Sequence, residues 1–150
     1  MSRRRPLDVL AAGIAGAVVS GFPSTVTTLL EGGDPLEGGR ALGKVLLPRR
    51  ERTPLLLAAG APVHLALSLG WAGVLGAVLP DHDEPVLAAL GGLAIAGLDL
   101  VVLGRLFPPI AALPQGRQWA DHVAFGLSVG VVLRATRRAG RRRPPGIAAR

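Results

Sequence analysis

The stretch that most constrains this chain runs from Val86 to Phe107 and is apolar almost throughout. Pro85 precedes it and two prolines follow it, so the sequence marks both of its ends. A helix rises about 1.5 Å per residue, so this stretch would be roughly 33 Å long and could cross a hydrocarbon core of about 30 Å. It contains one carboxylate, Asp99, and a charge at that depth needs a partner. We therefore expect a membrane helix whose polar side chain faces other helices.

Composition also favours a bundle of membrane helices over a soluble core. Hydrophobic residues make up 49% of the 150 residues but aromatic residues only 3%, and a soluble core normally contains more Phe, Tyr and Trp. The absence of cysteine excludes disulfides, thiolate catalysis and thiolate metal sites. Among the 17 cationic residues only Lys44 is not arginine, which is typical of a GC-rich bacterial genome.

Three further segments are apolar over comparable lengths. The sequence thus predicts an all-α fold, an integral membrane bundle of four transmembrane helices with spans at about 9–30, 56–79, 86–107 and 118–135. Residues 1–138 would form the transmembrane domain and 139–150 a disordered basic cytoplasmic tail. The basic start could also belong to a cleaved signal peptide, but apolar residues continue past Pro23 and favour an uncleaved first span.

Small residues recur at four-residue spacing on every predicted span. This spacing places them on one helix face, where two backbones can approach closely. The predicted packing residues are Gly13, Ala17 and Gly21, then Ser68, Ala72 and Gly76, then Ala88, Gly92 and Ala96, and finally Gly126 and Gly130.

The connectors and helix starts leave alternatives open. Residues 36–47 alternate apolar and charged side chains, which fits a short amphipathic helix at the membrane surface or an ordinary solvated loop. The second span begins either near Pro54, with a kink at Pro62, or at Pro62 itself. Residues 108–116 are too rich in proline to be expected as helix.

Orientation follows from the distribution of cations. If the termini share one side, that side holds ten arginines and the other side seven cations, so both termini are expected in the cytoplasm of a bacterial inner membrane. The terminal arginines would also contact anionic lipid headgroups. Nucleic acid is not expected as a partner, because no interleaved aromatic residues or docking motif accompany the basic tail.

Four ionisable side chains within the predicted spans are the candidate site, namely His64, Asp99, Asp121 and His122. Asp99 could pair with either histidine in a proton relay or an ion site, or simply bridge helices by hydrogen bonds. The two histidines could instead bind haem, or a metal ion together with the two aspartates. Aromatic residues are few for a haem pocket and the spacing is not that of a metal site, so we expect no cofactor.

Outside the spans, little points to chemistry. The acidic turn 81–84 could bind a cation weakly around His82, but is typical of a solvated turn. No hydrolase, metalloprotease or phosphate-binding motif occurs, so an enzyme is not expected.

The two halves of the chain resemble each other. Each contains a Gly/Ala-rich helix ending in Phe-Pro, at 22–23 and at 107–108, and later a helix with a histidine near its start. Two repeated helical hairpins would make the second and fourth spans parallel. This pattern, with the final motif Asp121-His122-Val-Ala-Phe-Gly-Leu-Ser-Val-Gly130, resembles the YagU-like and related families of uncharacterised small four-helix bacterial inner-membrane proteins. The resemblance implies the architecture and no particular chemistry.

The leading functional expectation is a small polytopic membrane protein that acts through helix packing and membrane partners, as a homo-oligomer or in a larger complex, without catalysis. One alternative is a proton- or ion-coupled carrier or channel that uses Asp99 with His64 and His122. Another is a haem- or metal-binding redox subunit with the same histidines as ligands.

Overall fold

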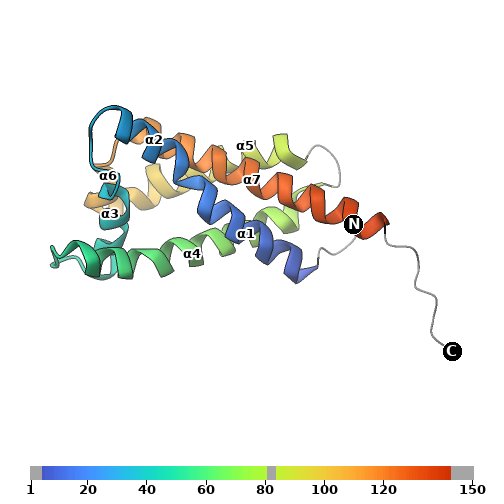
Figure 1. Ribbon diagram of the computed structural model, residues 1–150, viewed down its shortest axis with the longest axis horizontal. Coiled ribbons are helices and arrows are strands. Elements are labelled where there is room, and N and C mark those ends of the chain that lie inside the picture. The colour runs from blue at the N-terminus through green and yellow to red at the C-terminus, as the bar shows by residue number, and fades with distance from the viewer. Residues whose placement is uncertain (1–4, 81–83, 143–150) are drawn as a thin grey trace.

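The computed structural model describes residues 5–80 and 84–142, and over these residues the chain is all-helical. Figure 1 shows the long helical segments lying side by side. In chain order the helices are α1 (Pro6–Ser20), α2 (Phe22–Leu30), α3 (Glu37–Leu46), α4 (Thr53–Val78), α5 (Glu84–Ala96), η1 (Gly97–Val102), η2 (Leu103–Leu106), α6 (Pro108–Ala111) and α7 (Gln115–Arg142). The all-α class predicted from the sequence is confirmed.

Successive long segments run in opposite directions (Figure 1). The start of α1, the junction of α4 with α5 and the end of α7 lie at one end of the bundle, here called the termini end. The connectors that hold α3 and α6 lie at the opposite, connector end. The second and fourth segments, α4 and α7, therefore run parallel, as repeated hairpins would require, although the repeat itself stays a prediction.

Three of the long segments are long and apolar enough to cross a membrane, namely Pro6–Leu30, Thr53–Val78 and Glu84–Leu106. Their outward faces carry large apolar side chains that are 63% to 83% exposed: Leu7, Val18, Phe22, Leu30, Val78, Val86 and Leu106. So much exposed apolar surface marks contact with lipid or with a partner. Helix α7 does not belong to this set, because Gln118, Asp121 and His122 shorten its apolar run.

Prolines begin helices here more often than they interrupt them. Helix α4 begins at Thr53 with Pro54 in its first turn and passes through Pro62, so the earlier of the two predicted starts is right. The prediction of a non-helical segment at 108–116 is wrong for Pro108–Ala111, which form α6, and for residues 115–116, which begin α7. Proline is well accommodated in a first turn, where its missing N–H has no intrahelical acceptor.

The end of the chain also differs from its prediction. Helix α7 continues to Arg142, four residues into the tail predicted as disordered from Ala139. Alanine and arginine are strong helix formers, so Ala139, Arg141 and Arg142 favour this last helical turn. The remainder of the predicted tail and the acidic residues 81–83 lie outside the described residues.

Helix α7 is the central element of the bundle. It packs against α5, α1 and α2, whereas α4 packs mainly against α1 and α3. The α5–α7 contact is backbone to backbone, because a Cβ atom added at Gly92 would lie 2.2 Å from the carbonyl oxygen of His122. A Cβ added at Gly126 would lie 2.0 Å from the carbonyl oxygen of Ala88. Only glycine fits at either position.

The other predicted packing residues fall into two groups. Most lie in the interior: Ser68, Ala72, Gly76, Ala88 and Ala96 are buried, and an added Cβ would meet Leu69 and Ala72 at Gly13 and the Ala88 side chain at Gly130. Ala17 is half-buried. Gly21 differs, because it forms the break between α1 and α2 and an added Cβ would meet nothing within 4 Å.

A close contact between α3 and α4 was not foreseen. A Cβ added at Gly43 would lie 2.1 Å from the carbonyl oxygen of Leu56, and one at Gly60 would lie 2.7 Å from that of Gly39. The connector predicted as either helix or loop is therefore helical and is held directly on the bundle. The spacing of Gly39 and Gly43 is itself a small-xxx-small signal.

Candidate functional site

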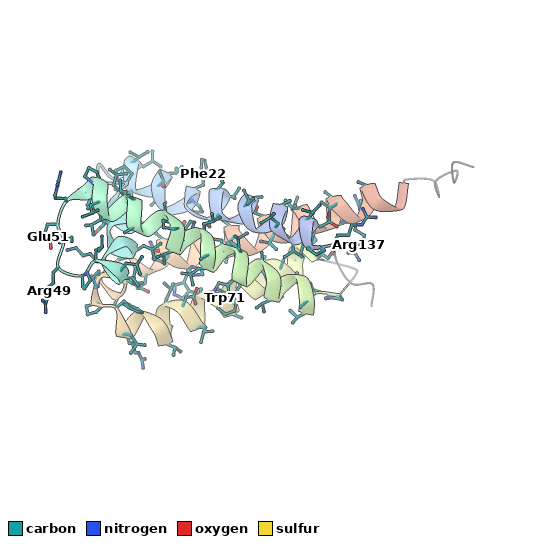
Figure 2. All side chains as sticks on the ribbon, turned by 90° about the horizontal axis from the view of Figure 1, so that it is seen from below. Phe22, Arg49, Glu51, Trp71 and Arg137 are labelled. Atoms are coloured by element: carbon teal, nitrogen blue, oxygen red, sulfur yellow. The ribbon has the colours of Figure 1, made fainter. Side chains whose placement is uncertain are left out.

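Polar side chains from α1, α4, η1 and α7 meet within the bundle, between its middle and the connector end. We call this set the central cluster; it comprises Ser20, His64, Trp71, Asp99, Asp121 and His122. All four ionisable residues predicted as the site belong to it, whereas Trp71 and Ser20 were not predicted as site residues. In Figure 2, Trp71 lies between the two ends of the bundle, away from Arg49 at the connector end and Arg137 at the termini end.

The innermost part of the cluster is a three-residue contact around one carboxylate oxygen. The indole Nε1 of Trp71 donates a hydrogen bond to Oδ2 of Asp99 at 3.1 Å. Nε2 of His122 lies 3.5 Å from the same oxygen. The second carboxylate oxygen, Oδ1, is buried and has no hydrogen-bond partner among the described residues. A buried oxygen in that state is available to a proton, a water molecule or an ion.

The hydrogen-bond pattern of His122 fixes where its protons must be. Its Nδ1 lies 2.8 Å from the carbonyl oxygen of Gln118, and a carbonyl can only accept, so Nδ1 carries a hydrogen. In a neutral ring Nε2 is then an acceptor, and so is the carboxylate oxygen of Asp99 that faces it. Two acceptors that face each other repel. The contact between Nε2 of His122 and Oδ2 of Asp99 is therefore favourable only when one additional proton is present, either on the ring or on the carboxyl. Asp99 and His122 thus form a pair that is complete only when it holds a proton.

The backbone around Asp99 is irregular in a way that widens this part of the third segment. Residues Gly97–Val102 form a π-helical turn, which continues into the 3₁₀ turn of η2. Such turns depart from the regular α-helical hydrogen-bond ladder and occur frequently at functional sites. Asp99 is the third residue of the π-helical turn, so the carboxylate lies where the helix geometry changes.

Asp121, on α7, is held by a hydrogen bond to the backbone of α2. Its Oδ1 accepts a hydrogen bond of 2.8 Å from the backbone N–H of Ser24, in the first turn of α2. First-turn N–H groups have no acceptor within their own helix, so α7 caps α2 from outside. Asp121 directly precedes His122 on α7 and lies near enough to His64 for their charges to interact.

His64 lies on the α1 side of the cluster. Its Nε2 is 2.9 Å from the carbonyl oxygen of Ala17 and 3.4 Å from Oγ of Ser20. The carbonyl requires that Nε2 carry the hydrogen. No hydrogen bond joins His64 to Asp99 within residues 5–80 and 84–142, so of the two partners considered for Asp99, only His122 is in contact with it.

A second group of polar contacts connects α2 with the start of α7 at the connector end. Arg117 donates to Oγ1 of Thr28 at 2.7 Å and forms an ion pair with Glu31. Thr27 donates to the carbonyl oxygen of Pro23 at 2.7 Å, the usual contact of a helical threonine with the carbonyl four residues earlier. We call Thr28, Glu31 and Arg117 the connector ladder; it lies one turn of α7 before Asp121.

The cluster does not fit a haem or a metal ion. Both ring nitrogens of His122 already face protein acceptors, and Nε2 of His64 is engaged by Ala17. Within the described part of the chain no three His, Asp or Glu side chains are grouped as metal ligands would be. To share one ligand site, His122 would have to give up one of these contacts and His64 would have to bind through Nδ1.

No family model matches the sequence, and no curated protein or solved structure is similar enough to it to count as a match. The resemblance to the YagU-like families therefore stays a prediction. Any functional conclusion has to be drawn from the cluster itself.

Proposed function

We propose that this chain is a proton carrier of the bacterial inner membrane, built from four transmembrane helices with both termini in the cytoplasm. The transported proton would be held between Asp99 and His122, and its binding would be coupled to movement of the surrounding helices. The single observation that carries this proposal is the facing of two hydrogen-bond acceptors, Oδ2 of Asp99 and Nε2 of His122, which need a shared proton. No covalent reaction is proposed for the cluster.

The four-helix membrane arrangement is supported by the position of α7. It lies along α5 and α1, which belong to segments apolar enough to span a bilayer, and so would share their depth. Its polar residues face the central cluster instead of lipid, which accounts for its lower hydropathy. A fourth span is thus compatible with these polar groups, since intramembrane charges normally face the interior of a bundle.

The proposed orientation is supported by ion pairs at the connector end. Seven cations at that end argue against placing it outside the cell, but three of them are neutralised by neighbouring carboxylates. These pairs are Arg40 with Asp34, Lys44 with Glu51 and Arg117 with Glu31. The terminal arginines then provide the stronger signal for the cytoplasmic side.

A carrier is favoured over an open channel by the distribution of polar and apolar groups. Polar groups extend from the connector ladder through Asp121 to His122 and Asp99. Towards the termini end, the interior is filled by an apolar core: Ala12, Ala72, Leu75, Leu79, Ala88, Phe125, Val129 and Leu133. Polar groups that extend inwards from one side and end at an apolar core are the arrangement expected of a carrier with alternating access.

The test is proton flux into liposomes that contain the purified protein and an internal pH-sensitive dye. Wild-type protein should dissipate an imposed pH gradient faster than protein-free liposomes. Asp99→Asn should reduce the flux to the protein-free rate, because an amide can still accept from Trp71 but cannot take up the proton. The matched control is Asp8→Asn in the first turn of α1, remote from the cluster, which should keep wild-type flux.

Two results would overturn the proposal. One is wild-type protein that conducts no protons under any imposed gradient, and the other is Asp99→Asn protein that conducts as well as wild type. A ¹⁵N NMR spectrum of the three histidines provides a readout independent of flux. His122 should show a proton on Nδ1 together with a second proton shared at Nε2, and this second signal should disappear in Asp99→Asn.

A further inference from the structure

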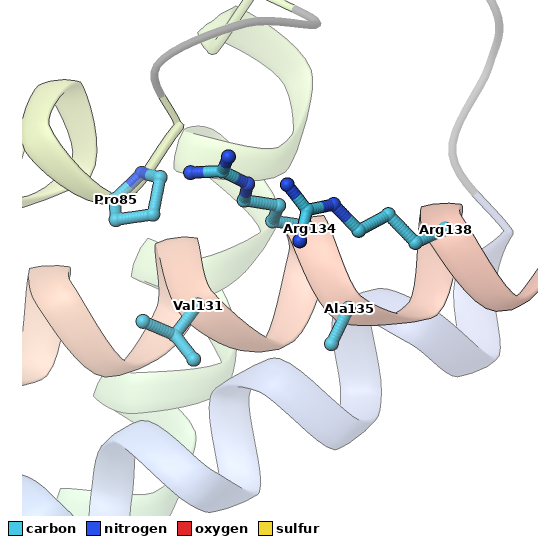
Figure 3. A pocket seen from close by; sticks show the side chains of 5 residues that line it. All are labelled: Pro85, Val131, Arg134, Ala135 and Arg138. Atoms are coloured by element: carbon cyan, nitrogen blue, oxygen red, sulfur yellow. The ribbon is translucent and has the colours of Figure 1, made fainter.

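A pocket of about 390 Å³ lies at the termini end, between the start of α5 and the last third of α7. It is lined by Pro85, Val131, Arg134, Ala135 and Arg138 (Figure 3). None of these residues belongs to the central cluster. The lining combines three apolar side chains with two guanidinium groups, so it is amphiphilic.

The two guanidinium groups share one side of α7. Arg134 and Arg138 are four residues apart, and Figure 3 shows the Arg138 side chain extending back along the helix towards Arg134, while the Arg134 side chain extends towards Pro85. Like charges at this spacing destabilise a helix unless an anion lies between them. Within the described residues, neither arginine forms an ion pair or a hydrogen bond to another side chain.

The neighbouring carboxylate is already neutralised. Glu84, at the start of α5, is only 1% exposed and forms an ion pair with Arg137, which does not line the pocket. Among the described residues that line the pocket, the charged side chains are therefore the two arginines, Arg134 and Arg138. The amino-terminal end of α5 adds the partial positive charge of its helix dipole beside Pro85.

The order of side chains along α7 matches the layers of a membrane surface. Val131 is 51% exposed and is continuous with the apolar outer face of the bundle, and the arginines follow within the next two turns. An occupant therefore has to be apolar at one end and anionic at the other. A phospholipid has this chemistry, since its phosphate accepts two guanidinium groups and its acyl chain covers an apolar side chain.

We propose that this pocket is a binding site for one anionic phospholipid, with the phosphate held between Arg134 and Arg138 and the acyl chain lying along Val131. The site is independent of the proton-binding pair and holds the termini end of α7 against the start of α5 at the membrane surface. It is more specific than a general attraction of basic tails to anionic membranes, because it depends on two arginines among the 17 cationic residues.

The test is lipid retention by the purified full-length protein, measured by native mass spectrometry after exchange into nanodiscs of phosphatidylglycerol and phosphatidylcholine. Wild-type protein should retain one phosphatidylglycerol in preference to phosphatidylcholine. Each arginine near a membrane surface contributes about fivefold in affinity, so Arg134→Gln/Arg138→Gln should weaken retention by about thirtyfold. The matched control is Arg49→Gln/Arg50→Gln, the same change of charge at the connector end, which should retain the lipid as wild type does.

The proposal is wrong if the pocket variant and the connector control retain phosphatidylglycerol equally well, or if both lose it equally. It is also wrong if excess inorganic phosphate displaces the retained lipid, because a free anion would then suffice without the apolar wall. Proton flux measured on the same variants separates the two proposals, since Arg134→Gln/Arg138→Gln should keep the wild-type gradient dissipation in phosphatidylcholine liposomes.

Discussion

The backbone contact between α5 and α7 also holds Asp99 and His122 together. The substitution Gly92→Ala tests both the contact and its effect on this pair. A Cβ atom at Gly92 would lie 2.2 Å from the carbonyl oxygen of His122 and 3.2 Å from the Cα of Val123. A carbon–oxygen contact needs about 3.3 Å, so α5 and α7 would have to separate by about 1 Å. Because Asp99 and His122 are already 3.5 Å apart, this separation would end their contact.

The free energy of this change can be bounded from two opposing effects. Forcing a methyl group into a close-packed contact costs about 1–3 kcal/mol, and here the opposing atoms are backbone atoms that cannot rotate away. Alanine recovers up to about 1 kcal/mol of that through its better helix propensity. Because the opposing atoms are backbone, the cost lies at the upper end of its range, and we expect Gly92→Ala to lower the free energy of unfolding by about 2 kcal/mol and to reduce proton flux.

The assay is denaturant titration in detergent micelles, followed by tryptophan fluorescence. Both tryptophans report on this region, because Trp71 contacts Asp99 and Trp119 packs near Gly97. The matched control is Gly73→Ala on α4, where an added Cβ would meet nothing within 4 Å. The control should be as stable as wild type or slightly more stable. Equal stability of Gly92→Ala and Gly73→Ala would refute the close α5–α7 contact.

Two further perturbations are expected to have separate effects. Replacing Arg137 by methionine should lower the free energy of unfolding by about 3–5 kcal/mol, because Glu84 is only 1% exposed and would lose its cation. The double variant with Glu84→Gln should regain most of the lost free energy of unfolding in the same titration. If it regains none, Arg137 does not stabilise the fold through its ion pair with Glu84. Acidification should loosen the start of α3, because the backbone N–H of Leu36 and the guanidinium of Arg40 lower the pKa of Asp34 below its ordinary value. A carboxyl with a lowered pKa stabilises the fold above its unfolded pKa of about 3.9, and this contribution is lost as the pH falls through the folded value. Hydrogen exchange at the Leu36 amide should therefore accelerate in that acidic range, and Asp34→Asn should remove the acceleration; an Asp34→Asn profile identical to wild type would contradict it.

Much of the helical framework can be predicted from the sequence, for a physical reason. Apolar runs bounded by proline determine where helices begin and end, and α4 and the third segment follow these signals closely. Helix α6 and the last turn of α7 are not predicted from the sequence, because the prolines of 108–116 and the Arg-, Gly- and Pro-rich composition after Ala139 favour a non-helical chain. Proline in a first turn and arginine within a helix are both compatible with helical geometry.

The ionisable residues of the candidate site can be predicted from the sequence, but most of the contacts between them cannot. Asp99, Asp121 and the two histidines are conspicuous as ionisable groups in apolar segments, and all four lie in the central cluster. Trp71 could have been found, since it lies seven residues after His64 and hence on the same face of α4. The π-helical turn at Asp99 has no sequence signal of this kind, because it depends on how the third segment packs.

The central claim, that α7 is a fourth membrane span, is tested most directly by labelling single cysteines with a membrane-impermeant maleimide in intact cells. The chain contains no cysteine, so Arg5→Cys, Arg49→Cys and Ala139→Cys each introduce one unique thiol. We predict that Arg49→Cys is labelled from outside and that Arg5→Cys and Ala139→Cys are labelled only after the membrane is permeabilised. Labelling of Ala139→Cys from the same side as Arg49→Cys, with Arg5→Cys protected, would contradict the account and leave only three spans.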